Sequence, residues 1–406
     1  MAVNLSEPSA LWPVAGVRLG TAEAAIKKPG RKDLLVIELA PGSRVAGVFT
    51  QNAFAAAPVR LCRERLSRTA AQRALLVNAG NANAATGRGG LDDARATTAA
   101  LAAALGCAPE EVLPFSTGVI GQRLPVQRIG EAIPRAVAAL APDAWLAAAR
   151  AIMTTDTVPK GASRRVRTAQ GEVTVTGIAK GVGMIEPHMA TMLAFVATDA
   201  RLTPAAADAA LRAAVDDSFN CVTVDSDTST NDACVLCATA KVGTHDIERG
   251  DADYHIVLDA IRAVCIELAH AVVRDGEGAT RFITVEVGGA ASTAEARQVA
   301  YAIANSPLVK TAMFAGDANW GRIVMAIGKA GVDGLDPARV GVKLDEVILL
   351  ENGEPHPDYR EERGAAVVAK PEFTIGVDLG RGDARARIWT CDFSYDYVKI
   401  NAEYRT

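Results

Sequence analysis

Short apolar runs alternate with longer amphipathic segments along nearly the whole chain, and this alternation limits the fold more than any other feature. Short apolar runs are typical of buried strands, and segments with apolar residues at helical spacing are typical of helices that cover a sheet. Such an order favours an α/β protein with layered sheets and helices. Because 406 residues exceed what one hydrophobic core usually supports, we expect two lobes.

The same pattern predicts where the individual elements lie. The expected strands are 34–39, 46–50, 74–78, 172–178, 192–198, 221–224, 233–242, 282–287, 373–377 and 386–390. The expected helices are 91–105, 126–141, 144–153, 204–217, 254–273, 293–305 and 321–330. Thr203 before Pro204 predicts a helix N-cap, and Ser292 three residues before Glu295 predicts a capping box.

Composition excludes several classes of function. Aromatic residues make up only 5% of the chain, so the core must consist of small aliphatic side chains, which suit closely packed layers. A net charge of −4 provides no general attraction for nucleic acid or anionic lipid. We see no signal-peptide pattern at the amino terminus and no apolar stretch long enough to span a membrane. We therefore expect a soluble cytoplasmic protein with a small polar substrate.

The seven cysteines are scattered through apolar stretches, which favours reduced thiols in the cytoplasm. Cys234 and Cys237 form a C-x-x-C pair inside a predicted buried strand. With no second Cys or His pair nearby, core packing is favoured over a metal or redox site.

Two polar, glycine-containing stretches interrupt the alternation. The stretch 78–90 follows a predicted strand, and its Asn and Gly residues fit either an ordinary turn-rich loop or a loop built for tight turns at a site. The stretch 343–365 is predicted to be a surface excursion.

The segment 177–199, GIAKGVGMIEPHMATMLAFVATD, carries the most chemical information. Three glycines surround Lys180, so the backbone there can approach a ligand closely. Thr191 stands where this loop meets an apolar run. Taken alone, Thr191 is only the start of a strand, where threonine is favoured. A phosphate-binding loop is excluded because its glycine and lysine spacing is absent.

Together with five other motifs, this segment resembles the ornithine acetyltransferase family, also called glutamate N-acetyltransferase. The other motifs follow in the family's order and span almost the whole chain: PFSTGVIGQRLP (114–125), DSDTSTND (225–232), RDGEGATRF (274–282), FAGDANWGRI (314–323) and YVKINAEYRT (397–406). His188 departs from the family pattern, which more often has Asn there, and we expect it to affect the cleavage rate at most.

The resemblance implies a layered α/β enzyme of the amino-terminal-nucleophile type that cuts itself between Ala190 and Thr191. Residues 1–190 would form an α chain and residues 191–406 a β chain, intertwined in one catalytic unit. Two such units would assemble into a heterotetramer of two α and two β chains.

The implied nucleophile is the hydroxyl of Thr191. Its own freed α-amine, with a reference pKa near 7.7–8.0, would be the base, so no histidine is needed. The resemblance assigns the oxyanion hole to Thr117 and Gly118, although an STG sequence alone also fits a plain turn.

The resemblance assigns substrate binding to Thr154, Lys180, Thr191, Glu277, Asn401 and Thr406. Lys180 would pair with a substrate carboxylate and Glu277 with an ammonium group. The implied reaction is a ping-pong transfer in arginine biosynthesis: N2-acetylornithine acetylates Thr191, ornithine leaves, and glutamate takes the acetyl group. We expect no metal and no cofactor.

Other interpretations of the sequence remain open. Self-cleaving aminopeptidases and amidohydrolases of related fold use the same kind of nucleophile, so water rather than glutamate could be the acceptor. A binding or structural protein of the same fold would stay uncut. Acetyl-CoA could also acetylate glutamate, and we favour that bifunctional case. The acidic stretch 225–232 lacks calcium-loop spacing and is interpreted as a structural loop near the site.

Overall fold

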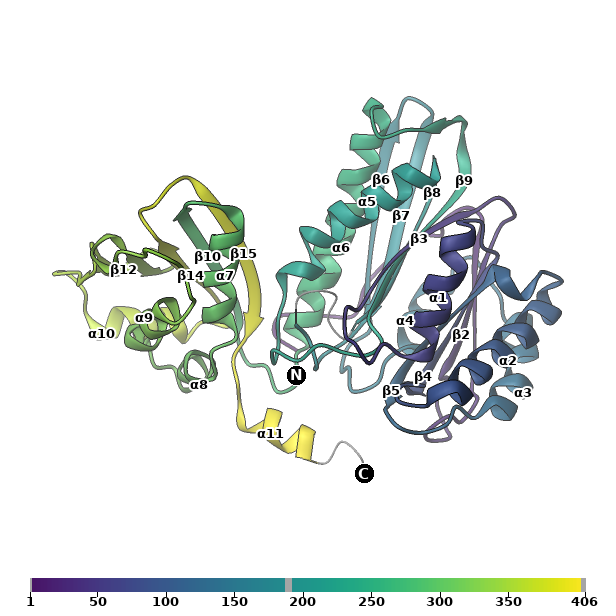
Figure 1. Ribbon diagram of the computed structural model, residues 1–406, viewed down its shortest axis with the longest axis horizontal. Helices are drawn as coiled ribbons and strands as arrows, with labels where there is room; N and C mark the ends of the chain where they lie inside the picture. Colours follow the sequence, from purple (N-terminus) through teal and green to yellow (C-terminus); the bar gives the residue numbers. More distant parts are fainter. Residues whose placement is uncertain (1, 187–191, 403–406) are drawn as a thin grey trace. The chain divides into compact units, whose positions relative to one another are not determined.

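The computed structural model describes residues 2–186 and 192–402, which separate into two compact units (Figure 1). The larger unit comprises Glu7–Asn220 and Asp227–Val272. The smaller unit comprises Met1–Ser6, Cys221–Ser226 and Val273–Thr406. Two units agree with the expectation of two lobes from chain length.

Two sheets form the framework of the larger unit. Sheet A has the strand order β1-β2-β4-β5, and sheet B has the order β3-β9-β8-β7-β6. Neighbouring strands are antiparallel except for the parallel pairs β4–β5 and β8–β9. The strands are β1 (Val17–Ala22), β2 (Leu34–Leu39), β3 (Arg44–Phe49), β4 (Ala74–Asn81), β5 (Val112–Val119), β6 (Lys160–Thr168), β7 (Gly171–Lys180), β8 (Leu193–Leu202) and β9 (Ala233–Ile247).

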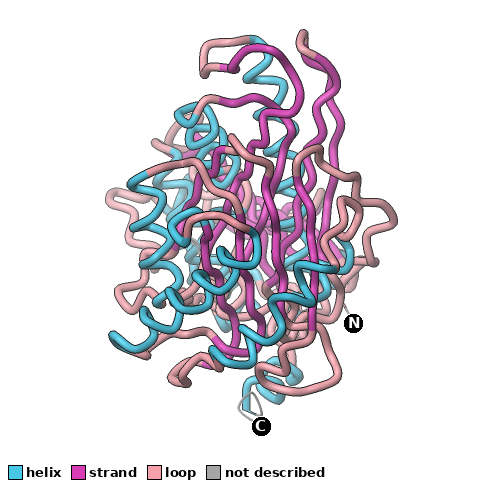
Figure 2. Tube along the Cα trace, turned by 90° about the vertical axis from the view of Figure 1, so that its right-hand side faces the viewer, coloured by secondary structure: helices cyan, strands magenta, loops and turns pink. Residues whose placement is uncertain are grey.

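Helices cover the outer faces of both sheets. The helices over sheet A include α1 (Ala57–Arg68), which also contacts β3, α2 (Gly87–Leu105) and α3 (Val126–Ala138). Seen from their side, they form a layer in front of long strands (Figure 2). Sheet B is covered by α5 (Pro204–Asp216) and α6 (Ala252–Arg274), and Gly177 on β7 leaves room for Val264 and Leu268 of α6. The larger unit is thus a layered α/β sandwich, which confirms the predicted fold class.

The core of the larger unit lies between the two sheets. Phe115 of β5 and Phe195 of β8 meet edge to face, with ring centroids 5.0 Å apart. Trp145 of the short helix α4 (Trp145–Ala151) is buried in the same cluster, and α4 contacts strands of both sheets. Most other members of the cluster are Val, Leu, Ile and Ala, as the low aromatic content requires.

The smaller unit is built on sheet C, with the order β13-β12-β11-β14-β10-β15. Its strands are β10 (Phe282–Ala290), β11 (Gly341–Leu344), β12 (Val347–Glu351), β13 (Glu354–Pro355), β14 (Glu372–Asp378) and β15 (Ala384–Cys391). Its helices are α7 (Thr293–Ala304), α8 (Pro307–Ala315), α9 (Trp320–Gly328), α10 (Glu361–Val368) and α11 (Tyr395–Ala402). Short 3-10 helices occur in the chain at Pro109–Glu111, Phe219–Cys221 and Pro337–Arg339.

The predicted helix starts are confirmed in most details. The Thr203 hydroxyl accepts a hydrogen bond from Ala206 N at 3.1 Å, and the Ser292 hydroxyl accepts one from Glu295 N at 3.1 Å. The Glu295 carboxylate bonds back to Ala291 N, one residue before the position that a capping box uses.

Two predicted segments are wrong. Residues 221–224 do not form a strand: a 3-10 turn ends at Cys221, and Val222 makes only an isolated bridge to Trp389. The stretch 343–365 is not a surface excursion, because it contributes to β11, β12, β13 and α10. Its Leu344, Leu349 and Leu350 are buried, and the charged residues around them belong to exposed positions of the same strands.

The cysteine interpretation agrees with the structure. All seven thiols are free, and Cys234 and Cys237 are buried on β9. Burial raises the pKa of Cys237 to about 12, so its thiol stays protonated and packs as a small apolar group. Within the described residues, every helix is too short or too polar to cross a bilayer.

The contact between sheets A and B gives a direct stability prediction. Phe195→Ala leaves a cavity beside Phe115, and we expect it to lower the free energy of unfolding by about 3–5 kcal/mol. Phe54→Ala is the matched control, because Phe54 is 72% exposed. Denaturant titration of both variants checks this, and equal losses in the two would contradict the assigned core.

Candidate active site

The predicted site residues fall into three groups. Thr117, Gly118, Thr154 and Lys180 lie in the larger unit. Glu277 and Asn401 lie in the smaller unit. Ala190, Thr191 and Thr406, together with His188, lie outside the described residues, so their assignments stay predictions.

Gly118 is held in a conformation that excludes a side chain. It lies near the end of β5 with φ of +134°, and a Cβ there would be 2.2 Å from the carbonyl carbon of Gly80 and 2.5 Å from Asn81 N. Its neighbour Thr117 is buried. The two residues therefore do not form a plain surface turn, because backbone crowding sets the direction of their peptide groups.

The polar stretch 78–90 packs against this end of β5. Asn78 Nδ2 donates to Asn81 O at 2.8 Å, and the Ser116 hydroxyl donates to Asn78 Oδ1 at 2.6 Å. Asn83 is fully buried and has a positive φ of 48°. The stretch is therefore a tightly bonded support for residues 116–118, which favours the second of the two interpretations of the sequence.

Lys180 ends β7 within a buried group of charges. Its Nζ lies 3.8 Å from Asp156 Oδ2, and Lys160 Nζ donates to Asp156 Oδ1 at 2.7 Å. The side chains of Asp156 and Lys160 are fully buried, and that of Lys180 is 4% exposed. Two cations thus share one carboxylate, and a buried lysine such as Lys180 is a chemical match for an anionic substrate group.

Asp156 also fixes the backbone on both sides of the site. Its Oδ2 accepts from Thr154 N at 2.9 Å, and its Oδ1 accepts from Gly181 N at 2.8 Å. Burial alone would raise the pKa of Asp156, but the charges of Lys160 and Lys180 hold it well below its usual range. Asp156 therefore stays ionised and ties the predicted binding residues Thr154 and Lys180 together.

Met192, the residue that follows Thr191, is held by the segment before β9. Met192 N donates to Asp232 Oδ1 at 3.1 Å, and Ala233 N donates to Met192 O at 3.1 Å. The preceding residue, Asn231, uses its side-chain amide to donate to Ser116 O at 2.9 Å and to Ala82 O at 2.7 Å. Residues 231 and 232 thus connect β5, which carries the predicted oxyanion-hole residues, with the start of β8.

In the smaller unit, Glu277 and Asn401 are bonded to each other. Asn401 Nδ2 donates to Glu277 Oε2 at 2.9 Å, and Glu277 is 8% exposed. α11 is fixed to its own unit by Tyr397, whose hydroxyl lies 3.3 Å from Asp225 Oδ2. These two hydrogen bonds join α11 to its own unit, although the helix has no buried residue.

Sequence reasoning missed Asp156, Lys160, Asn231 and Asp232. All four are nearly or fully buried polar residues in stretches that look like ordinary loops. The acidic stretch 225–232 was assigned only a structural role, and no periodic pattern indicates which of its residues are buried. A buried Asp needs partners, so its significance becomes visible only in the structure.

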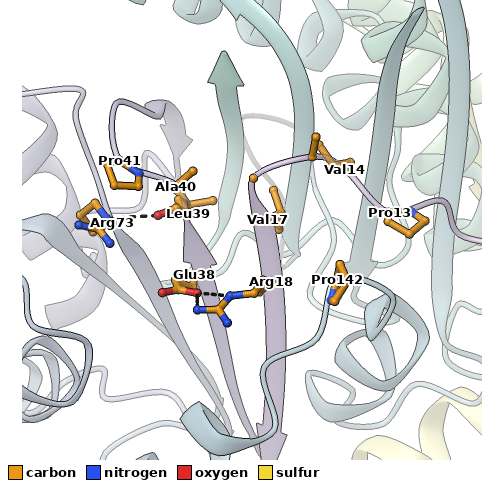
Figure 3. A pocket seen from close by; sticks show the side chains of 12 residues that line it. Pro13, Val14, Val17, Arg18, Glu38, Leu39, Ala40, Pro41, Arg73 and Pro142 are labelled. Carbon is orange, nitrogen blue, oxygen red and sulfur yellow. Dashed lines mark hydrogen bonds and ion pairs between the residues drawn. The ribbon is translucent and has the colours of Figure 1, made fainter. Parts of the chain in front are cut away.

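A surface hollow of the larger unit lies away from these residues. It has a volume of about 520 Å³ and is lined by residues 13–18, 38–41, 73 and 142 (Figure 3). Arg18 pairs with Glu38 there, and Arg73 Nε donates to Leu39 O at 3.2 Å. None of the predicted site residues lines it.

Comparison with known proteins covers the chain almost completely. The model of the ArgJ family matches residues 18–406. The arginine biosynthesis bifunctional protein ArgJ of Methylococcus capsulatus is 58% identical over 403 residues, which are 99% of this chain and 98% of that protein.

Two solved structures are each 39% identical to the chain. One is the arginine biosynthesis bifunctional protein argJ of Bacillus halodurans, with a TM-score of 0.49 over 51% of this chain and 97% of that one. The other is the ornithine acetyltransferase of Mycobacterium tuberculosis in complex with ornithine, with a TM-score of 0.40 over 43% of this chain and 92% of that one. The match of family model and curated relative over nearly the full length confirms the resemblance seen in the motifs: the chain belongs to the ArgJ family.

Proposed function

We propose that the chain transfers the acetyl group of N2-acetylornithine to glutamate through an acetyl ester on Thr191. Membership of the ArgJ family and 58% identity to an arginine biosynthesis bifunctional protein support acetyl transfer in arginine biosynthesis. One observation carries the proposal: Lys180 of β7 pairs with Leu193 of β8. This pairing puts a buried cation beside the strand that begins just after Thr191.

The described geometry supports roles for Lys180, Thr117 and Gly118. Lys180 would bind the α-carboxylate of the amino-acid substrate, with Asp156 keeping it in place. The peptide groups of Thr117 and Gly118 would stabilise the oxyanion that forms when Thr191 attacks the acetyl carbonyl. By family resemblance we assign the ammonium of ornithine to Glu277 and further substrate contacts to Thr154, Asn401 and Thr406.

Self-cleavage between Ala190 and Thr191 would generate the base for this reaction. The new α-amine is partly neutral near pH 7.7–8.0 and can take the proton of the Thr191 hydroxyl. The cut would fall between β7 and β8, which are neighbours in sheet B, so strand pairing would hold the two chains together. We further propose a heterotetramer of two α and two β chains.

Two wider aspects rest on the family. The relative from Methylococcus capsulatus is named bifunctional, so we propose acetyl-CoA as a second acetyl donor to glutamate and no resident cofactor. The seven free thiols and a role in amino-acid synthesis favour the cytoplasm.

The cut is tested by the intact mass of the denatured protein. We expect the wild type to give two chains, 1–190 and 191–406, with Thr-Met-Leu-Ala as the new amino terminus. Thr191→Ala should stay whole and lose at least about 100-fold in acetyl transfer, since both the nucleophile and the amine are lost. An active wild-type chain that remains whole would contradict the amine-base mechanism.

The acceptor is tested in the same preparation. Ornithine release from N2-acetylornithine should require glutamate and produce N-acetylglutamate in equal amount. Release of acetate at the same rate without glutamate would instead assign the protein to the amidohydrolases.

Lys180→Gln tests the carboxylate contact. Losing one charge-assisted bond of about 1.5–3 kcal/mol should raise KM for both amino-acid substrates by about 10- to 100-fold. Lys241→Gln is the matched control, because Lys241 is exposed in the same unit. A Lys180→Gln enzyme with an unchanged KM would refute the assigned contact.

A further inference from the structure

The fold does not explain why one carboxyl oxygen of Asp232 is buried. The residue is 1% exposed, and its Oδ1 accepts from Met192 N at 3.1 Å. Its Oδ2 is buried and has no hydrogen-bond partner in the part of the chain that the structure describes. Buried carboxyl oxygens almost always have a partner, so this oxygen points to a function beyond support.

The position of Asp232 is fixed from both sides. Thr50 N donates to Asp232 O at 3.0 Å, and the next residue, Ala233, pairs with Leu193 in the parallel β8–β9 ladder. The nitrogen that Oδ1 holds, Met192 N, is the one that the peptide bond joins to Thr191. Asp232 is therefore bonded directly to the backbone one residue after the proposed cleavage point.

The surroundings of Asp232 favour its protonated form. Burial raises the pKa of its carboxyl well above the usual value, and Met192 N, the nearby amide and hydroxyl of Ser229 and the charge of Lys180 oppose this only in part. Lys180 is also shared with the ionised Asp156, which itself pairs with Lys160. The carboxyl of Asp232 is thus driven towards its protonated form, which has a proton to give.

Self-cleavage requires such a group before the α-amine exists. When the Thr191 hydroxyl attacks the Ala190 carbonyl, the Oγ–C bond forms and the C–N bond breaks. The hydroxyl loses a proton, and the departing Thr191 nitrogen must gain one. While the nitrogen is still an amide it cannot serve as the base, so another group has to move the proton.

We propose that Asp232 is the proton-transfer residue of self-cleavage, giving the proton of Oδ2 to the Thr191 nitrogen and receiving the proton of the Thr191 hydroxyl. The acid is regenerated in this exchange. Water then hydrolyses the Ala190 ester, which leaves the Ala190 carboxylate and restores the hydroxyl. The inference rests on the proposed self-cleavage and adds the residue that carries it out.

A neutral Asp232 is also compatible with the later acetyl transfer. A carboxylate beside the new α-amine would stabilise its ammonium form and remove the base. A carboxylic acid does not hold the amine in that form.

The variant Asp232→Asn separates proton transfer from the structural role of Asp232. Its amide oxygen can still accept the hydrogen bond from Met192 N, but the amide has no acidic proton to transfer. Asp199→Asn is the matched control. Asp199 is buried on β8, and its Oδ1 accepts from Thr174 N at 2.8 Å. Burial raises the pKa of Asp199 as it does that of Asp232. Pulse-labelled chains from cell-free translation are transferred to buffers that span neutral pH, and the uncut fraction is followed by gel.

We expect the wild type and Asp199→Asn to cut at similar rates, and folded Asp232→Asn to cut about 100-fold more slowly or not at all. The wild-type rate should fall as pH rises through the raised pKa of Asp232, because the proton donor is then lost. Normal cutting by Asp232→Asn would overturn the inference, and so would a wild-type rate that rises steadily with pH. An uncut wild-type chain would instead refute the proposed function, and the inference with it.

Discussion

The face-to-face contact between sheets A and B is the interaction on which the larger unit depends. Phe115 and Phe195 meet there, and residues of α1 and α4 complete the core between the sheets. The site needs both sheets, since Gly118 belongs to sheet A and Lys180 to sheet B. Asn231, just before β9, bonds to Ser116 of sheet A and thereby ties the two sheets together beside the site.

Buried polar groups give this arrangement its chemistry. An ionised carboxylate in the interior costs several kcal/mol unless it is paired and hydrogen-bonded, and Asp156 has both kinds of partner. Asp232 also feels the charge of Lys180, yet burial drives it towards the neutral form. Burial and nearby charges therefore shift the pKa values of the two carboxyl groups in opposite directions, a pattern that enzymes use to divide binding from proton transfer.

Local signals in the sequence predicted much of the fold. Apolar runs such as 34–39 and the cap at Thr203 are decided by neighbouring residues, and both are confirmed. Elements with mixed patterns were missed: β5 contains Pro114 and Gly118, and β6 has three exposed arginines in its second half. The short strands within 343–365 were not predicted, because charged residues stand between their buried apolar residues.

The site was predictable only in part. Motif resemblance named Thr117, Gly118 and Lys180, which the structure places in one unit, but it did not indicate what holds them. Asp156 and Asp232 act through burial and through bonds to residues distant in sequence. Such properties depend on tertiary packing, which periodicity and composition do not encode.

Transfer through Thr191 is tested most directly by trapping the acetylated protein. The protein is mixed with N2-acetylornithine without glutamate, quenched in acid, and its chains are weighed and fragmented. We predict one added acetyl group on the amino-terminal threonine of the 191–406 chain, which disappears when glutamate is added before the quench. Turnover with no acetylated chain, or an acetyl group on a different residue, would contradict this mechanism.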